Sequence, residues 1–338
     1  MAKRLKLGLI GYGPYGQSLA RSALNTTKID VNMIYVYSED EVPLVEANGF
    51  NATTNLNELL QSNDIEAVVI ASPNALHKEH IIKACEAKKA IWAEKPLVLT
   101  LDDYDEVNAA IAKANVINHC NFSTRVGGIA RKTLELARNG ELGTLMHFIS
   151  RSSRGVGLHS MGSAHKAVLT PELSGGWIMH HMCHQVDYSI TLFNEKVKRV
   201  YAQSCRSTPD CPSEESISAI LTFESGAIAD LSDGLTPLGD HFFSVLGSKG
   251  AAHQNNGGLM FRNQLDDNDY GQGGHSTFFT PEAWSDDSMI AFYSVITGEP
   301  HGRNYELNIV PISEGRHVVE VELAIAESCK TGQVIQLS

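Results

Sequence analysis

The chain has 338 residues, a formal net charge of −12 and six cysteines. This length can form two domains, and a composition of 43% hydrophobic and 20% charged residues is typical of a globular protein. An acidic chain without a long cluster of Lys and Arg is not expected to bind nucleic acid. The chain also contains no apolar run of about 18 residues, the length needed to span a membrane. We therefore expect a small-molecule partner, and no nucleic-acid or membrane partner.

Two further features bear on the cellular compartment. The apolar run near the N-terminus is only about five residues long, and it breaks into glycines without the cleavage site of a secretory signal. The cysteines are scattered and form no CxxC pair, which fits reduced thiols. Both features predict a cytoplasmic protein.

Strands and helices alternate over the first 123 residues. The predicted strands are 5–10, 31–37, 67–72, 90–96 and 116–123, and the predicted helices between them include 57–62, 77–88 and 101–114. Such alternation is typical of a parallel sheet with helices on both faces. It predicts an α/β domain with a doubly wound Rossmann sheet at residues 1–123.

The pattern changes after about residue 141. Strand-like runs at 143–154, 197–208, 214–224, 227–233 and 241–247 follow one another with few helices between them. They predict a second, α+β domain at residues 124–338 with a large open and mostly antiparallel sheet. We expect a long loop at 155–176, an irregular stretch at 253–280, and a final helix over 313–332 that can pack back on the first domain.

A glycine-rich sequence, "GYGPYG", follows the first predicted strand and opens a helix. Its glycines, Gly11, Gly13 and Gly16, form a GxGxxG pattern in the position where backbone N–H groups and the helix dipole can bind a pyrophosphate. The intervening residues, Tyr12, Pro14 and Tyr15, are predicted to lie against the cofactor. The alternative is a purely structural strand-to-helix turn.

The end of the second strand bears on the choice of dinucleotide. Tyr37 and Ser38 occupy the position where a ribose-binding acid is usual, and Glu39 and Asp40 lie just beyond them. Two carboxylates would repel a 2′-phosphate, and no Arg lies near to bind one. The sequence favours NAD, and NADP is not excluded.

Four segments carry a resemblance to a known family. They are "SPNALH" (72–77), "AEKPLVLT" (93–100), "GGWIMHHMCHQVD" (175–187) and "AIAESCKTGQVIQL" (324–337). Together with the glycine loop they resemble the Gfo/Idh/MocA oxidoreductases over almost the whole chain. The resemblance implies hydride transfer between a nicotinamide cofactor and a secondary hydroxyl or ketone of a sugar, glycoside or polyol. It also implies a homodimer or homotetramer built through the open sheet.

The same resemblance assigns roles to the "EKP" motif and its neighbours. Lys95 would lie between the nicotinamide and the substrate and polarise the reacting oxygen, Glu94 would contact the cofactor, and Pro96 is cis in many relatives. The loop that passes beside the cofactor would include Ser72, Pro73, Asn74 and His77. The alternative for His77 is that it begins a helix and has no catalytic role.

The segment "HHMCH" departs from the family pattern. Relatives usually have Asp where this chain has His180, whereas His184 and Asp187 match the pattern. On an α-helix these three residues, at i, i+4 and i+7, share one face, with His181 and Cys183 off to either side. The resemblance makes His184 the catalytic acid/base, and His180 would assist by binding a neighbouring hydroxyl. A buried histidine pair without catalytic function is the alternative.

Two rival functions remain open. His180 and His184 also have the spacing of a helical metal pair, with His159 or His165 as a third ligand. A metal there would suit a redox-assisted lyase or glycosidase that recycles its NAD. The second rival is a sensor that binds NAD and a sugar without turnover.

Three further residues could contact the substrate. Arg125 and Arg154 could reach its oxygens, with a structural salt bridge as the alternative for each. Trp177 could stack on a sugar face or belong to the core.

Overall fold

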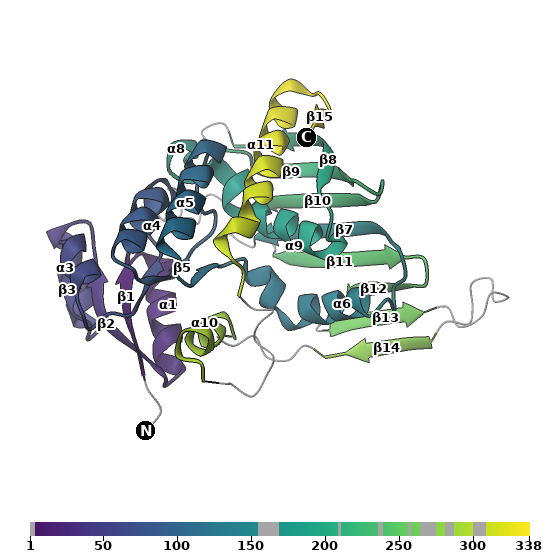
Figure 1. The fold of residues 1–338 in the computed structure, drawn as a ribbon. Helices are drawn as coiled ribbons and strands as arrows, with labels where there is room; N and C mark the ends of the chain where they lie inside the picture. The colour runs from purple at the N-terminus through teal and green to yellow at the C-terminus, as the bar shows by residue number, and fades with distance from the viewer. Residues whose placement is uncertain are drawn as a thin grey trace. The chain divides into compact units, whose positions relative to one another are not determined.

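The computed structural model describes residues 4–154, 169–208, 211–235, 239–255, 258–263, 275–280, 287–299 and 309–338. The chain divides into two compact units (Figure 1). Unit 1 comprises residues 1–122, 172–174 and 285–319, and unit 2 comprises residues 123–171, 175–284 and 320–338.

Unit 1 is built on a six-stranded parallel sheet. Its strands are β1 (Leu5–Ile10), β2 (Ile29–Tyr35), β3 (Ala52–Thr53), β4 (Ala67–Ile70), β5 (Ala90–Ala93) and β6 (Asn118–Cys120). They lie in the order β3-β2-β1-β4-β5-β6, so the order reverses beside β1. In open parallel sheets, ligands bind at the carboxyl ends of the strands next to such a reversal. The glycine loop after β1 and the loop after β4 lie at this position.

The crossover helices of unit 1 begin at local sequence signals. They are α1 (Pro14–Asn25), α2 (Val42–Ala47), α3 (Leu56–Gln61), α4 (His77–Glu86) and α5 (Leu101–Ala114), with short 3₁₀ turns η1 (Glu39–Glu41) and η2 (Asn74–Leu76). The Thr100 hydroxyl accepts from the Asp103 N–H at the start of α5, and Asn55 caps α3 through the Asn57 N–H. The predicted helix over 101–114 agrees with α5. Its start could be predicted because the capping residue, Thr100, directly precedes it in the sequence.

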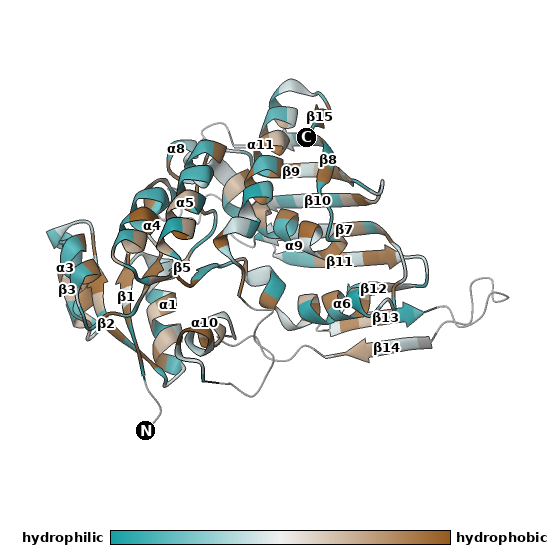
Figure 2. Ribbon diagram, in the orientation of Figure 1, coloured by the Kyte–Doolittle hydropathy of each residue, from teal (hydrophilic) through white to brown (hydrophobic). Residues whose placement is uncertain are grey.

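The core of unit 1 includes a helix from late in the chain, which the sequence analysis missed. Helix α10 (Asp287–Thr297) contributes Met289, Phe292 and Tyr293 to the buried cluster that contains Leu5 and Leu7 of β1. Figure 2 shows hydrophobic residues along α10 and β1. The hydrophobic face of α10 is therefore part of the first core although more than 160 residues separate it from β6.

Unit 2 contains a nine-stranded sheet in the order β14-β13-β12-β11-β7-β10-β9-β8-β15. Its strands are β7 (Leu145–Arg154), β8 (Val197–Cys205), β9 (Ser216–Phe223), β10 (Ile228–Leu235), β11 (Asp240–Gly247), β12 (Gly250–Asn255), β13 (Gly258–Asn263), β14 (His275–Phe279) and β15 (Ile335–Gln336). The β7–β10 pair is parallel and the other pairs are antiparallel. The predicted α/β fold with a second, mostly antiparallel sheet is confirmed.

The two faces of this sheet differ. Helices α6 (Gly128–Arg138) and α9 (Cys183–Phe193) cover one face (Figure 1), and inward residues of β10 such as Ala229 and Leu231 are buried there. The opposite face carries large hydrophobic side chains that are at least 37% exposed: Tyr201, Ile220, Ile228 and Phe242. Tyr201 lies directly across from Ile220 in the strand register.

The prediction of an irregular stretch at 253–280 is wrong where the structure describes it. Strands β12, β13 and β14 occupy most of the described part of this range. The strands β12 and β13 are separated in the sequence by Asn256 and Gly257, and Asn-Gly is the strongest short signal for a hairpin. The many polar residues nearby obscured it. The final helix, α11 (Arg316–Thr331), begins after a 3₁₀ turn, η7 (Ile312–Gly315), and ends before Gly332 as expected.

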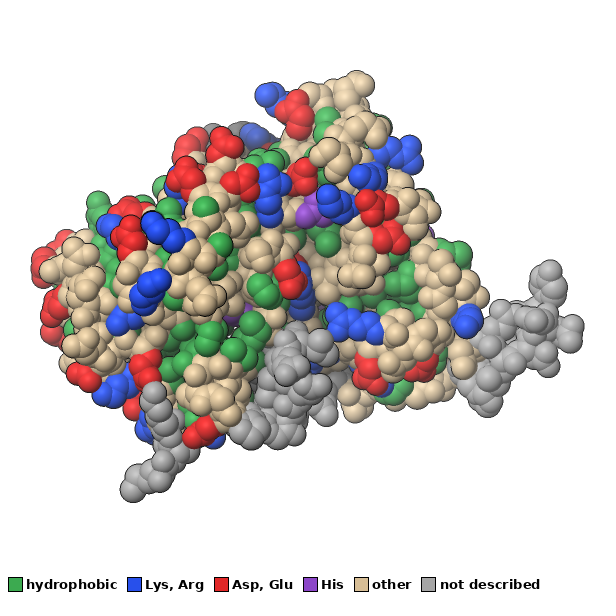
Figure 3. Space-filling model, in the orientation of Figure 1, with side chains coloured by type: hydrophobic (Ala, Val, Ile, Leu, Met, Phe, Trp, Pro, Cys, Tyr) green, Lys and Arg blue, Asp and Glu red, His purple; other side chains and the backbone are tan. Residues whose placement is uncertain are grey.

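Charged side chains of both signs are interspersed over the face shown in Figure 3. Among the helices of the described ranges, none is long and apolar enough to cross a bilayer.

Candidate functional site

The glycine loop of unit 1 has the shape of a dinucleotide cradle. Gly11 has a φ of +99°, and a Cβ there would lie 2.7 Å from the Ala71 carbonyl oxygen. A Cβ at Gly16 would lie 2.4 Å from the Gly11 carbonyl oxygen, so α1 can approach β1 only with glycine at this position. Around Gly13, by contrast, a Cβ would meet nothing within 4 Å. The loop therefore leaves open space at the N-terminus of α1, where a pyrophosphate fits.

The two tyrosines of this loop are placed differently. Tyr15 is 50% exposed, so its ring is accessible to a cofactor. Tyr12 is 5% exposed and packs edge-to-face on Phe50 within the unit 1 core. The expectation that the Tyr12 ring lies against the cofactor does not match this placement, because the ring faces the core. Pro14, the first residue of α1, is exposed.

Acidic residues follow the end of β2. The Ser38 hydroxyl accepts from the Asp40 N–H, and the Glu41 carboxylate accepts from the N–H groups of Tyr37 and Ser38. The turn thus places three acidic residues, Glu39, Asp40 and Glu41, directly after β2, next to the expected ribose position. This negative charge disfavours a 2′-phosphate more strongly than the two carboxylates considered from sequence. The Tyr37 side chain is 80% exposed.

The "EKP" motif follows β5. Lys95 is half-buried and the Lys95–Pro96 peptide bond is cis. Glu94 is buried, and its Oε1 accepts a 2.7 Å hydrogen bond from Nδ2 of Asn121, a residue that the sequence analysis did not single out. Burial raises the pKa of Glu94 to about 7, although the neighbouring Lys95 and the Asn121 amide act to lower it. A buried carboxyl that titrates near neutrality therefore lies next to the expected catalytic lysine.

We predict that Glu94→Gln stabilises unit 1 at alkaline pH. Because the folded-state pKa of Glu94 is raised from 4.5 to about 7, its stabilising contribution is complete below pH 4.5 and is lost as the pH rises through 7. A neutral amide avoids this loss, so the variant should gain about 3 kcal/mol over the wild type at pH 8.5 and little at pH 4.5. Urea unfolding at both pH values measures the difference. An equal difference at both would contradict the assignment.

The loop after β4 is fixed by histidines. His77 has no exposed surface, and its ring nitrogens lie 2.8 Å from the Ser72 carbonyl oxygen and 3.0 Å from that of Pro96. Burial lowers the pKa of His77 to about 4. The expectation of a cofactor contact is therefore wrong for the His77 side chain, which instead links the loops that follow β4 and β5.

The other expected residues of this loop are placed as follows. The Ser72 hydroxyl lies 2.8 Å from Nδ1 of His80 and is buried. Pro73 is exposed. The Asn74 amide is half-buried and donates to the Ser174 carbonyl oxygen.

In unit 2 the histidine segment is not a regular α-helix. Residues Ile178–Met182 form a π-helical turn, and α9 begins at Cys183. A π turn has a wider spacing than an α-helix and is frequent at functional sites. From Gly176 to Ser189 only His180 and His184 are half-buried, and all other residues are buried. His180 and His184 are therefore the accessible residues of this segment, and their pairing on one side stays a prediction.

Asp187 does not share this accessible side. Its carboxylate is completely buried and forms a bidentate ion pair with Arg125, at 2.7 Å from Nε and 2.5 Å from Nη2. The Arg125 side chain is 10% exposed. The expected common face of His180, His184 and Asp187 is therefore wrong for Asp187, because this carboxylate faces the 3₁₀ turn that carries Arg125.

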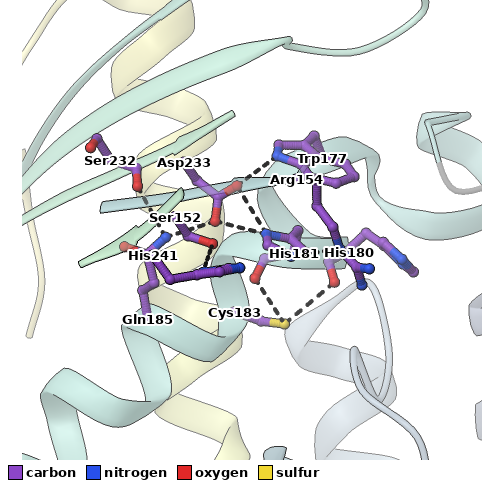
Figure 4. Close-up of polar contacts among 10 residues, drawn as sticks. All are labelled: Ser152, Arg154, Trp177, His180, His181, Cys183, Gln185, Ser232, Asp233 and His241. Carbon is purple, nitrogen blue, oxygen red and sulfur yellow. Dashed lines mark hydrogen bonds and ion pairs between the residues drawn. The ribbon is translucent and has the colours of Figure 1, made fainter. Parts of the chain in front are cut away.

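A buried carboxylate on β10 organises the turn, as Figure 4 shows. Asp233 accepts hydrogen bonds from Nε1 of Trp177, Nδ1 of His181 and Nε2 of Gln185. The Trp177 ring is 2% exposed and stacks on the His181 ring at a centroid distance of 4.6 Å. The expected sugar stacking is thus wrong for Trp177, which belongs to the core.

His181 is the neighbour that the sequence analysis set aside. Its Nδ1 lies 2.8 Å from Oδ2 of Asp233, and its Nε2 accepts from Nε of Arg154 at 3.2 Å. Asp233 could have been found in the sequence, because it continues the inward, apolar positions of β10 at Ala229 and Leu231. A carboxylate in such a row indicates a buried charge that needs partners.

A metal site receives no support from the described ranges, where no group of three or more His, Cys, Asp and Glu residues could hold an ion. His159 and His165, the expected third ligands, lie outside the described residues.

These features define an NAD-binding oxidoreductase. A family model described as an oxidoreductase family with an NAD-binding Rossmann fold matches residues 5–122, and the C-terminal domain model of the same family matches residues 130–253. The two matches together span well over half of the chain. It belongs to the Gfo/Idh/MocA family, as its motifs indicated.

Named relatives act on sugars and cyclitols. The 1,5-anhydro-D-fructose reductase of Ensifer adhaerens is 25% identical over 98% of each chain. The myo-inositol 2-dehydrogenase of Thermotoga maritima is 27% identical over 75% of each chain. A solved levoglucosan dehydrogenase in complex with NADH and levoglucosan has the same fold, with a TM-score of 0.81 and 20% identity over 99% of each chain.

Proposed function

We propose that this protein transfers hydride between NAD and a secondary hydroxyl or ketone of a sugar or polyol. The observation that carries the proposal is the half-buried Lys95 in its Glu-Lys-Pro motif, which follows β5 of the same parallel sheet whose β1 leads into the open glycine loop. The sugar and cyclitol activities of the named relatives support the substrate class. The relatives give less support to a redox-assisted lyase or to a sensor without turnover.

Each proposed residue has a separate task. Bound NAD supplies the hydride acceptor, and the glycine loop with the acidic turn after β2 would hold it. Lys95 donates a hydrogen bond that polarises the reacting oxygen, and His184 takes up or returns the proton of the hydroxyl. His180 binds a neighbouring hydroxyl where relatives have Asp. Buried Glu94 holds the backbone of Lys95 through the Lys95 N–H, which lies 3.3 Å from Oε2.

We further propose that residues 1–123 bind the cofactor and residues 124–338 bind the substrate and a second copy of the chain. The exposed hydrophobic side chains on the open face of the nine-stranded sheet, such as Tyr201 and Ile220, support a homodimer or homotetramer. A net charge of −12 and the interspersed charges of Figure 3 support a small-molecule partner rather than a nucleic acid. The scattered cysteines without a CxxC pair support a cytoplasmic location.

A spectrophotometric screen tests the proposal. Purified protein with NAD⁺, and separately with NADP⁺, is mixed with a panel of sugars, glycosides, sugar acids, sugar phosphates and cyclitols. We expect NADH formation with at least one of them and a preference for NAD⁺. Substrate conversion with NAD but without net NADH would indicate the lyase, and absence of any conversion would refute both enzymes.

A further inference from the structure

Arg154 donates to an imidazole instead of a carboxylate. Within the described ranges, ion pairs with carboxylates are formed by Arg4, Arg125, Arg151, Arg206 and Arg316. Arg154 forms no such ion pair with any carboxylate of the described ranges, and its Nε instead donates to the imidazole of His181. Its side chain lies at the end of β7 and is exposed.

The hydrogen bond from Arg154 fixes the tautomer of the His181 imidazole. An arginine N–H can only donate, so Nε2 of His181 must accept. The ring hydrogen is then on Nδ1, which donates to Asp233 at 2.8 Å. The carboxylate thus selects one tautomer of His181, and that tautomer presents a lone pair to Arg154.

Asp233 itself is held on several sides. Its side chain is completely buried, and Trp177 and Gln185 also donate to it. Figure 4 shows these donors converging on Asp233 while Arg154 reaches toward His181. These hydrogen bonds hold the Asp233 carboxylate in one position. It is therefore the fixed starting point of the series of hydrogen bonds that runs through His181 to Arg154.

The guanidinium keeps most of its hydrogen-bonding capacity. Only Nε is used by His181, so the Nη1–Nη2 edge retains four N–H donors in a planar fork. Such a fork matches the paired oxygens of a carboxylate or phosphate. The His181 ring that anchors it lies 6.2 Å from the ring of His184, so Arg154 belongs to the same cluster as the proposed acid/base.

We propose that Arg154 binds an anionic group of the substrate, and that the His181–Asp233 pair positions it. The substrate is then a sugar or polyol with a carboxylate or a phosphate. This inference rests on the proposed function, because it names the substrate class of the same site.

The test compares matched sugars. In the presence of NAD, D-glucose, D-galactose and D-mannose are each titrated by calorimetry beside the corresponding uronic acid and 6-phosphate. We expect the full-length protein to bind one uronate or one 6-phosphate about 10–100-fold more tightly than its neutral partner, the value of a charged bidentate contact. A preference for the uronate or for the phosphate identifies the anion. Equal binding of all neutral and anionic partners would overturn the proposal.

Substitution locates the effect. Arg154→Gln should remove the preference for the anion, so that the anionic and neutral partners bind with similar affinity. Arg151→Gln is the matched control, because Arg151 lies on the same strand but points to the opposite face and pairs with Asp240. An anion preference that survives in Arg154→Gln, or that disappears equally in Arg151→Gln, would overturn the assignment.

The positioning role has its own readout. Asp233→Asn can turn an N–H toward Nδ1 of His181 and so favour the tautomer that repels Nε of Arg154. We expect a higher KM for the anionic substrate with an almost unchanged kcat, and no further loss when Arg154→Gln is added. Additive losses in the double variant would refute the positioning role, even if Arg154 binds the anion.

The two levels of proposal fail differently. Turnover of neutral sugars with no binding preference for anions refutes the inference and leaves the oxidoreductase intact. Binding of an anion that depends on Arg154, without any NADH formation, refutes the oxidoreductase and leaves the anion site intact.

Discussion

Lys95→Met lowers kcat/KM for sugar oxidation by about 10²–10⁴-fold, the range found when a group that assists proton transfer or polarises the reacting oxygen is removed. Methionine keeps the length and hydrophobic stem of lysine but has no ammonium group to donate to the reacting oxygen. Because Lys95 is proposed to contact the substrate oxygen rather than the pyrophosphate, NAD binding should change little. Stopped-flow absorbance of NADH and calorimetric titration of NAD measure the two effects.

The controls separate chemistry from folding. Lys83→Met removes an ammonium from an exposed ion pair with Glu79 on α4, and its activity should match the wild type. His184→Asn should lower kcat by a similar factor, and the double variant with Lys95→Met should be little worse than either single variant, because we propose that the two groups serve one transition state. Wild-type activity of Lys95→Met would refute the assigned role.

The fold of unit 1 could be predicted because its signals are local. The strand at 5–10, the glycine turn after it and the cap at Thr100 each lie within a few residues of the element that they specify. Helix α10 could not be placed in this way. Its hydrophobic face indicates that it is buried, but only the folded structure shows that it packs on Leu5 and Leu7.

The candidate site was predictable in its residue types and less so in its contacts. The accessible pair His180 and His184 followed from the motif. The contacts around the π turn did not, because their shared acceptor Asp233 lies 52 residues from His181 and binds three donors in and before α9. For the same reason the sequence left Trp177 open between sugar stacking and a core position: Asp233, which accepts from its indole N–H, lies on a distant strand.

Asp187→Asn is expected to reduce the free energy of unfolding by about 3–5 kcal/mol. The carboxylate is completely buried and neutralises Arg125, whose side chain is 10% exposed, so the substitution leaves a buried cation without its counter-charge. Replacing both residues by hydrophobic ones, as in Asp187→Leu with Arg125→Met, should restore part of the lost stability, because the buried charge is then absent. Urea denaturation at pH 7 measures all three proteins.

The Arg316–Asp105 pair provides the matched control. It has the same bidentate geometry, with Nε and Nη2 on the two carboxylate oxygens, but its side chains are 40% and 55% exposed. Asp105→Asn should therefore cost at most about 1 kcal/mol. If the two Asp→Asn variants lost equal stability, burial would not be the cause of the effect.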